Sequence, residues 1–80
     1  MQLIEAHISI DKDIRFGKPC IKNTRITVSD ILNWLASGMS FEEIMVDFPE
    51  IKREHILAAL AFSAKREEAI KTVVYTKTTN

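Results

Sequence analysis

The sequence has little of the residue types that build disulfides, metal cages or flexible linkers. It contains one cysteine, two glycines and two prolines in 80 residues. A single cysteine excludes an intramolecular disulfide and a cysteine-based metal cage. The two histidines, His7 and His55, lie far apart in the sequence with no cysteine or carboxylate arranged beside them. We therefore expect neither a metal site nor a cofactor.

The chain also lacks long apolar runs and an excess of charge of either sign. No run approaches the roughly 18 apolar residues of a membrane-spanning helix, and the N-terminus has no secretory pattern. We therefore expect a cytoplasmic protein without a membrane partner. Basic and acidic residues number 11 each, whereas dedicated nucleic-acid binders are usually basic. Any DNA contact should depend on a local patch. No nucleophile–base set or phosphate loop is evident, so we expect no enzyme.

Alternation of apolar and polar residues over 3–10 predicts a strand with one buried face. Ile14 and Phe16 are expected to anchor the loop that follows. The most tightly patterned stretch is residues 17–32, where Lys22-Asn23 lies between two short β-prone segments. Asparagine tolerates positive φ, so we predict a short hairpin with a two-residue turn there.

Two amphipathic stretches that follow the hairpin predict two short helices. The first should begin at Val28 behind the N-cap Thr27 and end at Gly38. The second should begin behind the N-cap Ser40 and end before Pro49. In each case an acidic residue stands three positions after the cap, as in a capping box.

A third helix is predicted from near Arg53 to about Lys71, with a poorly capped start because Lys52 offers no acceptor. Residues 56–64 are apolar on nearly every face, and such a helix must be covered on more than one side. We expect a second copy to cover one side, giving a homodimer. The residues that we place in this interface are Trp34, Leu57, Ala58, Ala61 and Phe62.

These elements predict a mainly α fold: a three-helix, helix-turn-helix-like core preceded by an N-terminal strand and a short β-hairpin. We expect a single domain over residues 1–66, with the strand and hairpin in 1–27 and the three-helix core in 28–66. Residues 67–80 should hold the end of the third helix and a flexible or strand-like tail, since residues 72–76 are β-branched and aromatic.

Two groups of basic residues are candidates for a DNA contact. One is the start of the third helix, because the second helix of a helix-turn-helix enters the major groove with its first residues. The other is the hairpin, which carries the one local basic cluster. The candidates are Lys18, Lys22, Arg25, Lys52, Arg53 and His55. Simple solvation is the alternative for the helix start, and we favour a structural ion pair of Arg25 with Asp11, Asp13 or Asp30.

The pattern G-K-P-C-I-x-N-T-R-I at residues 17–26, with L-A-x-G-x-S-x-E-E-I at 35–44 and F-P at 48–49, resembles the bacterial domain-of-unknown-function family 433. The likeness covers roughly Ile8 to Ala64. It departs from the family at Asn23, where glycine is usual, and at Lys52, where a threonine cap is usual.

The resemblance implies an antitoxin with a helix-turn-helix-like core, a PIN-like ribonuclease toxin as partner, and possible autoregulation through operator DNA. We expect the C-terminal segment from about Glu67 to bind the toxin. The residues that we place in this contact are Lys71, Val73, Val74, Tyr75 and Lys77. The alternative function is a stand-alone helix-turn-helix transcriptional regulator.

Overall fold

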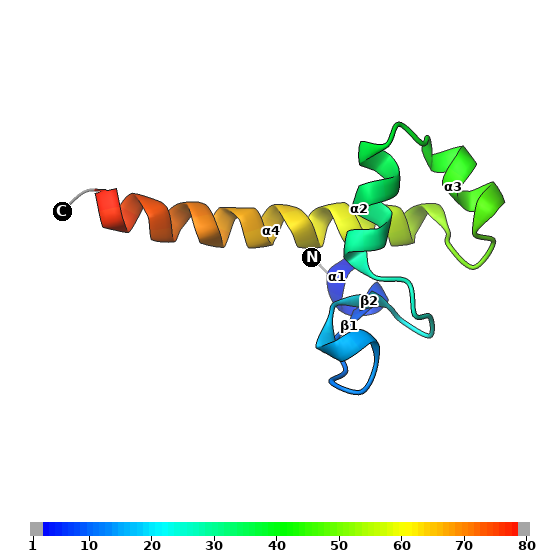
Figure 1. Ribbon diagram of the computed structural model, residues 1–80, viewed down its shortest axis with the longest axis horizontal. Helices are drawn as coiled ribbons and strands as arrows, with labels where there is room; N and C mark the ends of the chain where they lie inside the picture. The colour runs from blue at the N-terminus through cyan, green and yellow to red at the C-terminus, as the bar shows by residue number, and fades with distance from the viewer. Residues whose placement is uncertain (1–2, 79–80) are drawn as a thin grey trace.

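The computed structural model describes the backbone of residues 3–78 and the side chains of residues 3–68. It is mainly helical, with a small two-stranded antiparallel sheet (Figure 1). In chain order the elements are α1 (Leu3–His7), β1 (Ile8–Ser9), the 3₁₀ turn η1 (Arg15–Gly17), β2 (Cys20–Ile21), α2 (Val28–Ala36), α3 (Phe41–Asp47) and α4 (Arg53–Thr78).

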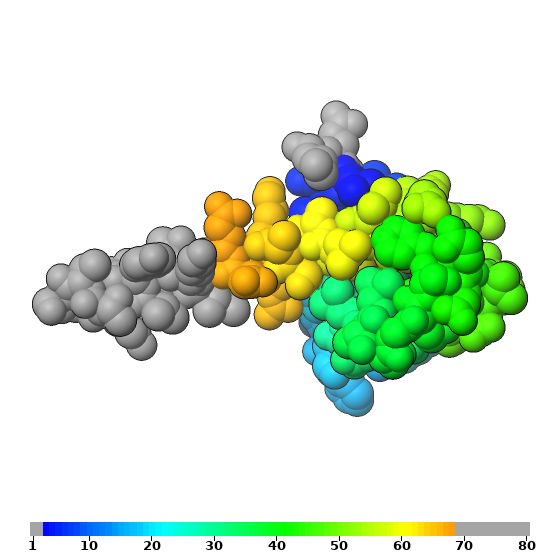
Figure 2. Space-filling view, turned by 90° about the horizontal axis from the view of Figure 1, so that it is seen from above, coloured from blue at the N-terminus to red at the C-terminus, as the bar shows by residue number. Residues whose placement is uncertain are grey.

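The long helix α4 is the axis of the molecule, and α1, α2 and α3 all pack against its first half (Figure 1). Figure 2 shows the surface of α4 lying between α1 and the α2–α3 pair. The core is built largely from isoleucines, each at most 1% exposed and each contributed by a different segment. They are Ile21, Ile31, Ile44, Ile51 and Ile56.

The N-terminal strand predicted over residues 3–10 is wrong for most of its length. The structure has a short helix over Leu3–His7, and only Ile8 and Ser9 are extended. Leu3, Ile4 and His7 are partly buried while Glu5 and Ala6 are exposed, so the same apolar residues also satisfy a helical spacing. Packing of α1 on α4 decides between the two patterns, since short apolar runs fit either period.

The predicted hairpin is present in a modified form. Ile21 donates its N–H to the carbonyl of Ile26 at 2.9 Å, and Cys20 is bridged to Thr27, so the connection is a four-residue loop at 22–25. It is not the two-residue turn that we predicted. Asn23 adopts φ 64°, as expected for this residue. On its other side β2 pairs with β1, in the register Ile8–Ile21 and Ser9–Cys20.

The starts and ends of the two short helices are confirmed. Thr27 and Asp30 form a reciprocal capping box at α2, and Ser40 and Glu43 form one at α3. Gly38 follows α2 at φ 101°, a left-handed conformation that glycine adopts at little cost. Local chemistry therefore fixes both boundaries.

Helix α4 begins at the predicted residue but extends to Thr78, past the predicted end at Lys71. The strand-like tail over 72–76 is therefore wrong. β-branched residues lower helix propensity only slightly, which is too little to end a helix that is already formed. In Figure 1 the second half of α4 projects beyond the other elements. Within the described part of the chain, no helix combines the length and apolarity needed to cross a bilayer.

Candidate functional site

The 22–25 loop is held in one conformation by hydrogen bonds on both sides. The backbone N–H and the hydroxyl of Thr24 both donate to the carbonyl of Ile21, at 3.1 and 2.9 Å. The same hydroxyl accepts from the N–H of Ile26 at 3.0 Å. These bonds constrain the loop backbone, and the loop leaves the side chains of Lys22, Asn23 and Arg25 exposed.

Arg15 ties this loop to the start of α2. Its Nη1 donates to the carbonyl of Arg25 at 2.8 Å and lies 3.3 Å from Oδ2 of Asp30. That carboxylate also accepts from the N–H of Thr27, so one oxygen serves both the cap and the ion pair.

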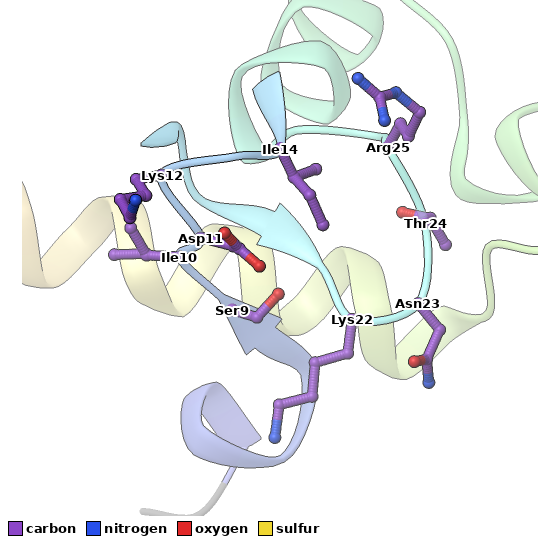
Figure 3. A pocket seen from close by; sticks show the side chains of 9 residues that line it. All are labelled: Ser9, Ile10, Asp11, Lys12, Ile14, Lys22, Asn23, Thr24 and Arg25. Atoms are coloured by element: carbon purple, nitrogen blue, oxygen red, sulfur yellow. The ribbon is translucent and has the colours of Figure 1, made fainter. Parts of the chain in front are cut away.

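We predicted that Arg25 would be this structural tie, and that prediction is wrong. The Arg25 side chain is exposed, makes no ion pair with any described residue, and points away from the loop in Figure 3. The reason is geometric, because Arg15 approaches Asp30 from the η1 turn and also donates to the carbonyl of Arg25. We call these two contacts of Arg15 the clamp.

Beside the 22–25 loop lies an open hollow of about 760 Å³. Figure 3 shows Ser9, Asp11 and Ile14 pointing into the ring that the loop and residues 9–14 form. Three cations, from Lys12, Lys22 and Arg25, stand around its rim. Hydrogen-bonding groups inside and positive charge outside suit a polar, anionic ligand.

The Lys22 ammonium is partly engaged, since it donates to the carbonyl of Glu5 at 2.7 Å. Oδ1 of Asp11 accepts from the N–H of Asp13 at 2.8 Å. Each group keeps hydrogen-bonding capacity beyond these contacts, because an ammonium has three donors and a carboxylate about four acceptor positions.

The η1 turn next to the hollow displays an aromatic ring that we had expected to be packed. Arg15, Phe16 and Gly17 all have positive φ, at 50°, 60° and 78°. Such angles are uncommon outside glycine and unfavourable for bulky residues. Phe16 is 96% exposed, so the prediction that it anchors the loop is wrong. The only hint in the sequence is its place between a cation and a glycine, outside any apolar stripe.

Three backbone hydrogen bonds hold the η1 turn. Ile14 donates to Asp11, Gly17 to Ile14, and Lys18 to Arg15, at 3.0 to 3.1 Å. The turn also lies against the rim of the hollow, because a Cβ on Gly17 would stand 3.7 Å from the Lys12 Cα. Figure 2 shows the surface around residues 11–17 projecting from the body.

At the start of α4, side chains that we considered for DNA contact make contacts within the chain. Nη2 of Arg53 lies 3.0 Å from Oε2 of Glu42, and its guanidinium sits 5.1 Å from the ring centre of Phe41. Nδ1 of His55 accepts from the N–H of Lys52 at 2.9 Å. Lys52 offers no side-chain acceptor to the first N–H groups of α4, but His55, at the third helical position, satisfies the N–H of Lys52 itself.

His55 also contacts His7 of α1, edge to face, with ring centres 5.1 Å apart. Burial lowers the pKa of His55 below its usual 6.5; the nearby His7 and Lys52 lower it further, while Glu54 opposes them. His55 is therefore neutral at pH 7, the state in which Nδ1 can accept a hydrogen bond.

The same contact joins the two groups of basic candidates. Lys22 donates its backbone N–H to the carbonyl of His7 at 2.9 Å, so Lys22 and His55 both contact His7. Spacing in the sequence could not show this juxtaposition. Lys18 and Arg25 lie on the ribbon, by which we mean residues 8–27 with β1, the η1 turn, β2 and the 22–25 loop, and Lys52 is exposed at the start of α4.

The interface candidates divide by burial. Ala58 is fully buried within its own chain and cannot meet a second copy, so that prediction is wrong. Trp34 stacks on Phe48 with ring centres 3.9 Å apart. Leu57 is 42% exposed, and Ala61 and Phe62 are half-buried. The side chains of the toxin-contact candidates, Lys71, Val73, Val74, Tyr75 and Lys77, lie outside the described residues.

Cys20 is a buried thiol that donates to the carbonyl of Lys18 at 3.4 Å. Among residues whose side chains the structure describes, no three His, Cys, Asp or Glu groups are placed to hold a metal ion.

The fold and this ribbon define a small helical domain with a two-stranded sheet at one end of its core. Residues 8–63 match the family model described as "Protein of unknown function (DUF433)", and the chain belongs to that family. The crystal structure of a DUF433 member protein from Anabaena variabilis ATCC 29413 has the same fold. The TM-score is 0.75 at 24% sequence identity, covering 92% of this chain and 73% of that one. No curated protein matches the sequence.

Proposed function

We propose that this chain is an antitoxin that binds and neutralises a PIN-like ribonuclease toxin. Two considerations support this function. The chain belongs to DUF433, and the resemblance described above implies an antitoxin role. The observation that carries the proposal is the projection of α4 beyond the rest of the fold (Figure 1). We call residues 3–66 the folded head.

A helix that projects from its own fold is stabilised when a partner protein covers it. A helix of about 12 residues is marginal on its own in water, and the portion of α4 beyond the head is about that long. A groove of a partner protein can cover such a helix. In this proposal residues 67–80 cover the acidic metal site or the RNA groove of the toxin, and Lys71 and Lys77 complement its negative charge.

The antitoxin is also proposed to act as a homodimer. Leu57 and Leu60 on the head portion of α4 are 42% and 38% exposed. Both are large apolar residues on the helix that forms the axis of the core. A second copy that covers them would remove this apolar surface from water.

The first step is to look for a PIN-like reading frame adjacent to this gene, and the proposal is then tested by co-expressing the two chains. A chain ending at Arg66 should lose toxin binding, measured by calorimetry and by relief of ribonuclease inhibition. A chain ending at Thr78 is the matched control and should bind normally. Circular dichroism checks that the head stays folded. Inhibition by the Arg66 form with unchanged affinity would sink the assignment of the binding segment.

A stand-alone helix-turn-helix regulator is the second candidate, favoured by the exposed Lys52 at the start of α4. The engagement of Arg53 by Glu42 and of His55 by the Lys52 N–H counts against it. This function requires strongly salt-dependent binding to a short palindromic duplex.

A further inference from the structure

We propose that the ribbon end of the head binds single-stranded nucleic acid, with Phe16 as a stacking platform for a base. This site comprises the η1 turn, the 22–25 loop and the hollow that this loop lines together with residues 9–14. It goes beyond the proposed antitoxin function and does not depend on toxin binding.

The first argument is the display of Phe16. Its ring is 96% exposed on a turn in which two consecutive non-glycine residues have positive φ. Such strain persists only where the surroundings impose it, and it clusters at functional sites. Here the hydrogen bonds of the turn and the Arg15 clamp impose it. An aromatic face held this way is pre-organised for stacking, and every base offers a π-face.

The second argument is the local charge. The chain is neutral, but residues 11–30 hold five basic and three acidic residues, a net charge of +2. Arg15 is neutralised by Asp30, whereas Lys18 and Arg25 are exposed and make no ion pair with a described residue. The Lys12 side chain is 91% exposed, and its 3.9 Å ion pair with the 79% exposed Asp13 side chain is a weak surface pair that a phosphate can displace. These three cations are therefore available to phosphates.

The third argument is the chemistry of the hollow. Ser9 and Asp11 point into it, with Ile14 as an apolar wall (Figure 3). A carboxylate would repel a phosphate at the centre of the hollow. It can instead accept from the amino group of a base. The hollow thus has hydrogen-bond acceptors inside and cations at its rim, and the exposed Phe16 ring is on the adjacent η1 turn. This combination fits a single-stranded nucleic acid, whose bases are unstacked and accessible.

A duplex fits this arrangement poorly, because its bases are already stacked and paired. An acidic protein partner is the competing occupant of an exposed apolar side chain among cations. The two can be separated at Phe16, since an apolar protein pocket accepts leucine, whereas base stacking requires an aromatic ring.

The experiment is fluorescence anisotropy of the full chain with labelled oligo-deoxycytidylate and oligo-cytidylate, whose bases carry an amino group, and with a duplex of the same length. The single strands should bind more tightly than the duplex. Log affinity should fall with log salt with a slope of about −2, as expected for three phosphate contacts to a single strand. The ratio of the two single strands reports whether DNA or RNA is preferred.

Phe16→Ala should weaken single-strand binding about 5- to 100-fold. Phe16→Trp should preserve it, and Phe16→Leu should weaken it almost as much as alanine. Lys18→Ala and Arg25→Ala should each reduce the magnitude of the salt slope by about 0.7.

The matched controls are Val46→Ala, an apolar side chain 76% exposed on α3, and Lys65→Ala, an exposed cation on α4. Both should bind like the unmodified chain. No binding at low salt, tighter binding to the duplex, or full binding by Phe16→Leu would overturn the proposal; the last result would point to a protein partner. Circular dichroism on each variant excludes unfolding as the cause of a loss.

Discussion

The ribbon end and the start of α4 both carry basic residues, but the structure uses them differently. At the start of α4 two of the three candidate side chains serve the fold, since Arg53 pairs with Glu42 and His55 accepts from the Lys52 N–H. At the ribbon end Arg15 holds the loop and Lys22 donates to the Glu5 carbonyl, whereas the Lys18 and Arg25 side chains stay exposed and make no ion pair with a described residue. The number of basic residues in a segment therefore does not give the number of basic side chains that a ligand can contact.

The largest effect that tests this contrast is expected at the clamp. Arg15→Ala removes charge-assisted hydrogen bonds to the Arg25 carbonyl and to Asp30. It should lower the free energy of unfolding by about 1–2 kcal/mol, the lower part of the range for such bonds because the site is partly exposed. Arg53→Ala breaks an exposed pair and should cost at most about 0.5 kcal/mol. Urea denaturation followed by circular dichroism measures both, and equal losses would contradict the contrast.

The features that the sequence predicts well are those that local chemistry determines. The capping boxes at Thr27 and Ser40 and the stop at Gly38 depend on a few neighbouring residues, and all three are observed. The positive φ of Asn23 belongs to the same class. Each of these features needs no knowledge of the rest of the fold.

The features that were missed depend on contacts between distant segments. Residues 3–7 suit either a strand or a helix, and packing on α4 decides. The exchange of roles between Arg15 and Arg25 follows from the left-handed η1 turn, which nothing in the spacing specifies. The exposure of Phe16 has the same origin. Of the candidate site, the cations of the 22–25 loop were predicted from the sequence, but not the part that residues 9–14 and the η1 turn play beside it.

A smaller effect is expected from the titration of His55. Its pKa is lowered in the folded state, chiefly by burial, so the unfolded chain binds the proton more tightly. The neutral ring stabilises the fold fully above pH 6.5. This stability is lost as the pH falls below 6.5 toward the lowered pKa, because protonated Nδ1 cannot accept from the Lys52 N–H.

Urea midpoints at pH 7.5 and pH 5.5, chosen as about one unit either side of the usual histidine pKa, measure this effect. His55→Gln is the informative variant, since glutamine at the third helical position can still complete the cap but does not titrate. It should keep the stability at neutral pH and lose the part of the pH dependence that His55 contributes. An unchanged pH profile in this variant would assign the dependence to another group.

The smallest expected effect on stability, at Arg25, gives the sharpest comparison. Because the side chain is exposed and unpaired within the described chain, Arg25→Ala should change the free energy of unfolding by less than about 0.5 kcal/mol. The Arg25 carbonyl, which the clamp uses, is unaffected by the substitution. If Arg25→Ala lowers the free energy of unfolding by about 1 kcal/mol or more, measured alongside Arg15→Ala, then the Arg25 side chain has a structural role after all. Unchanged stability, together with a smaller salt dependence of nucleic-acid binding, would instead identify Arg25 as a ligand-binding residue.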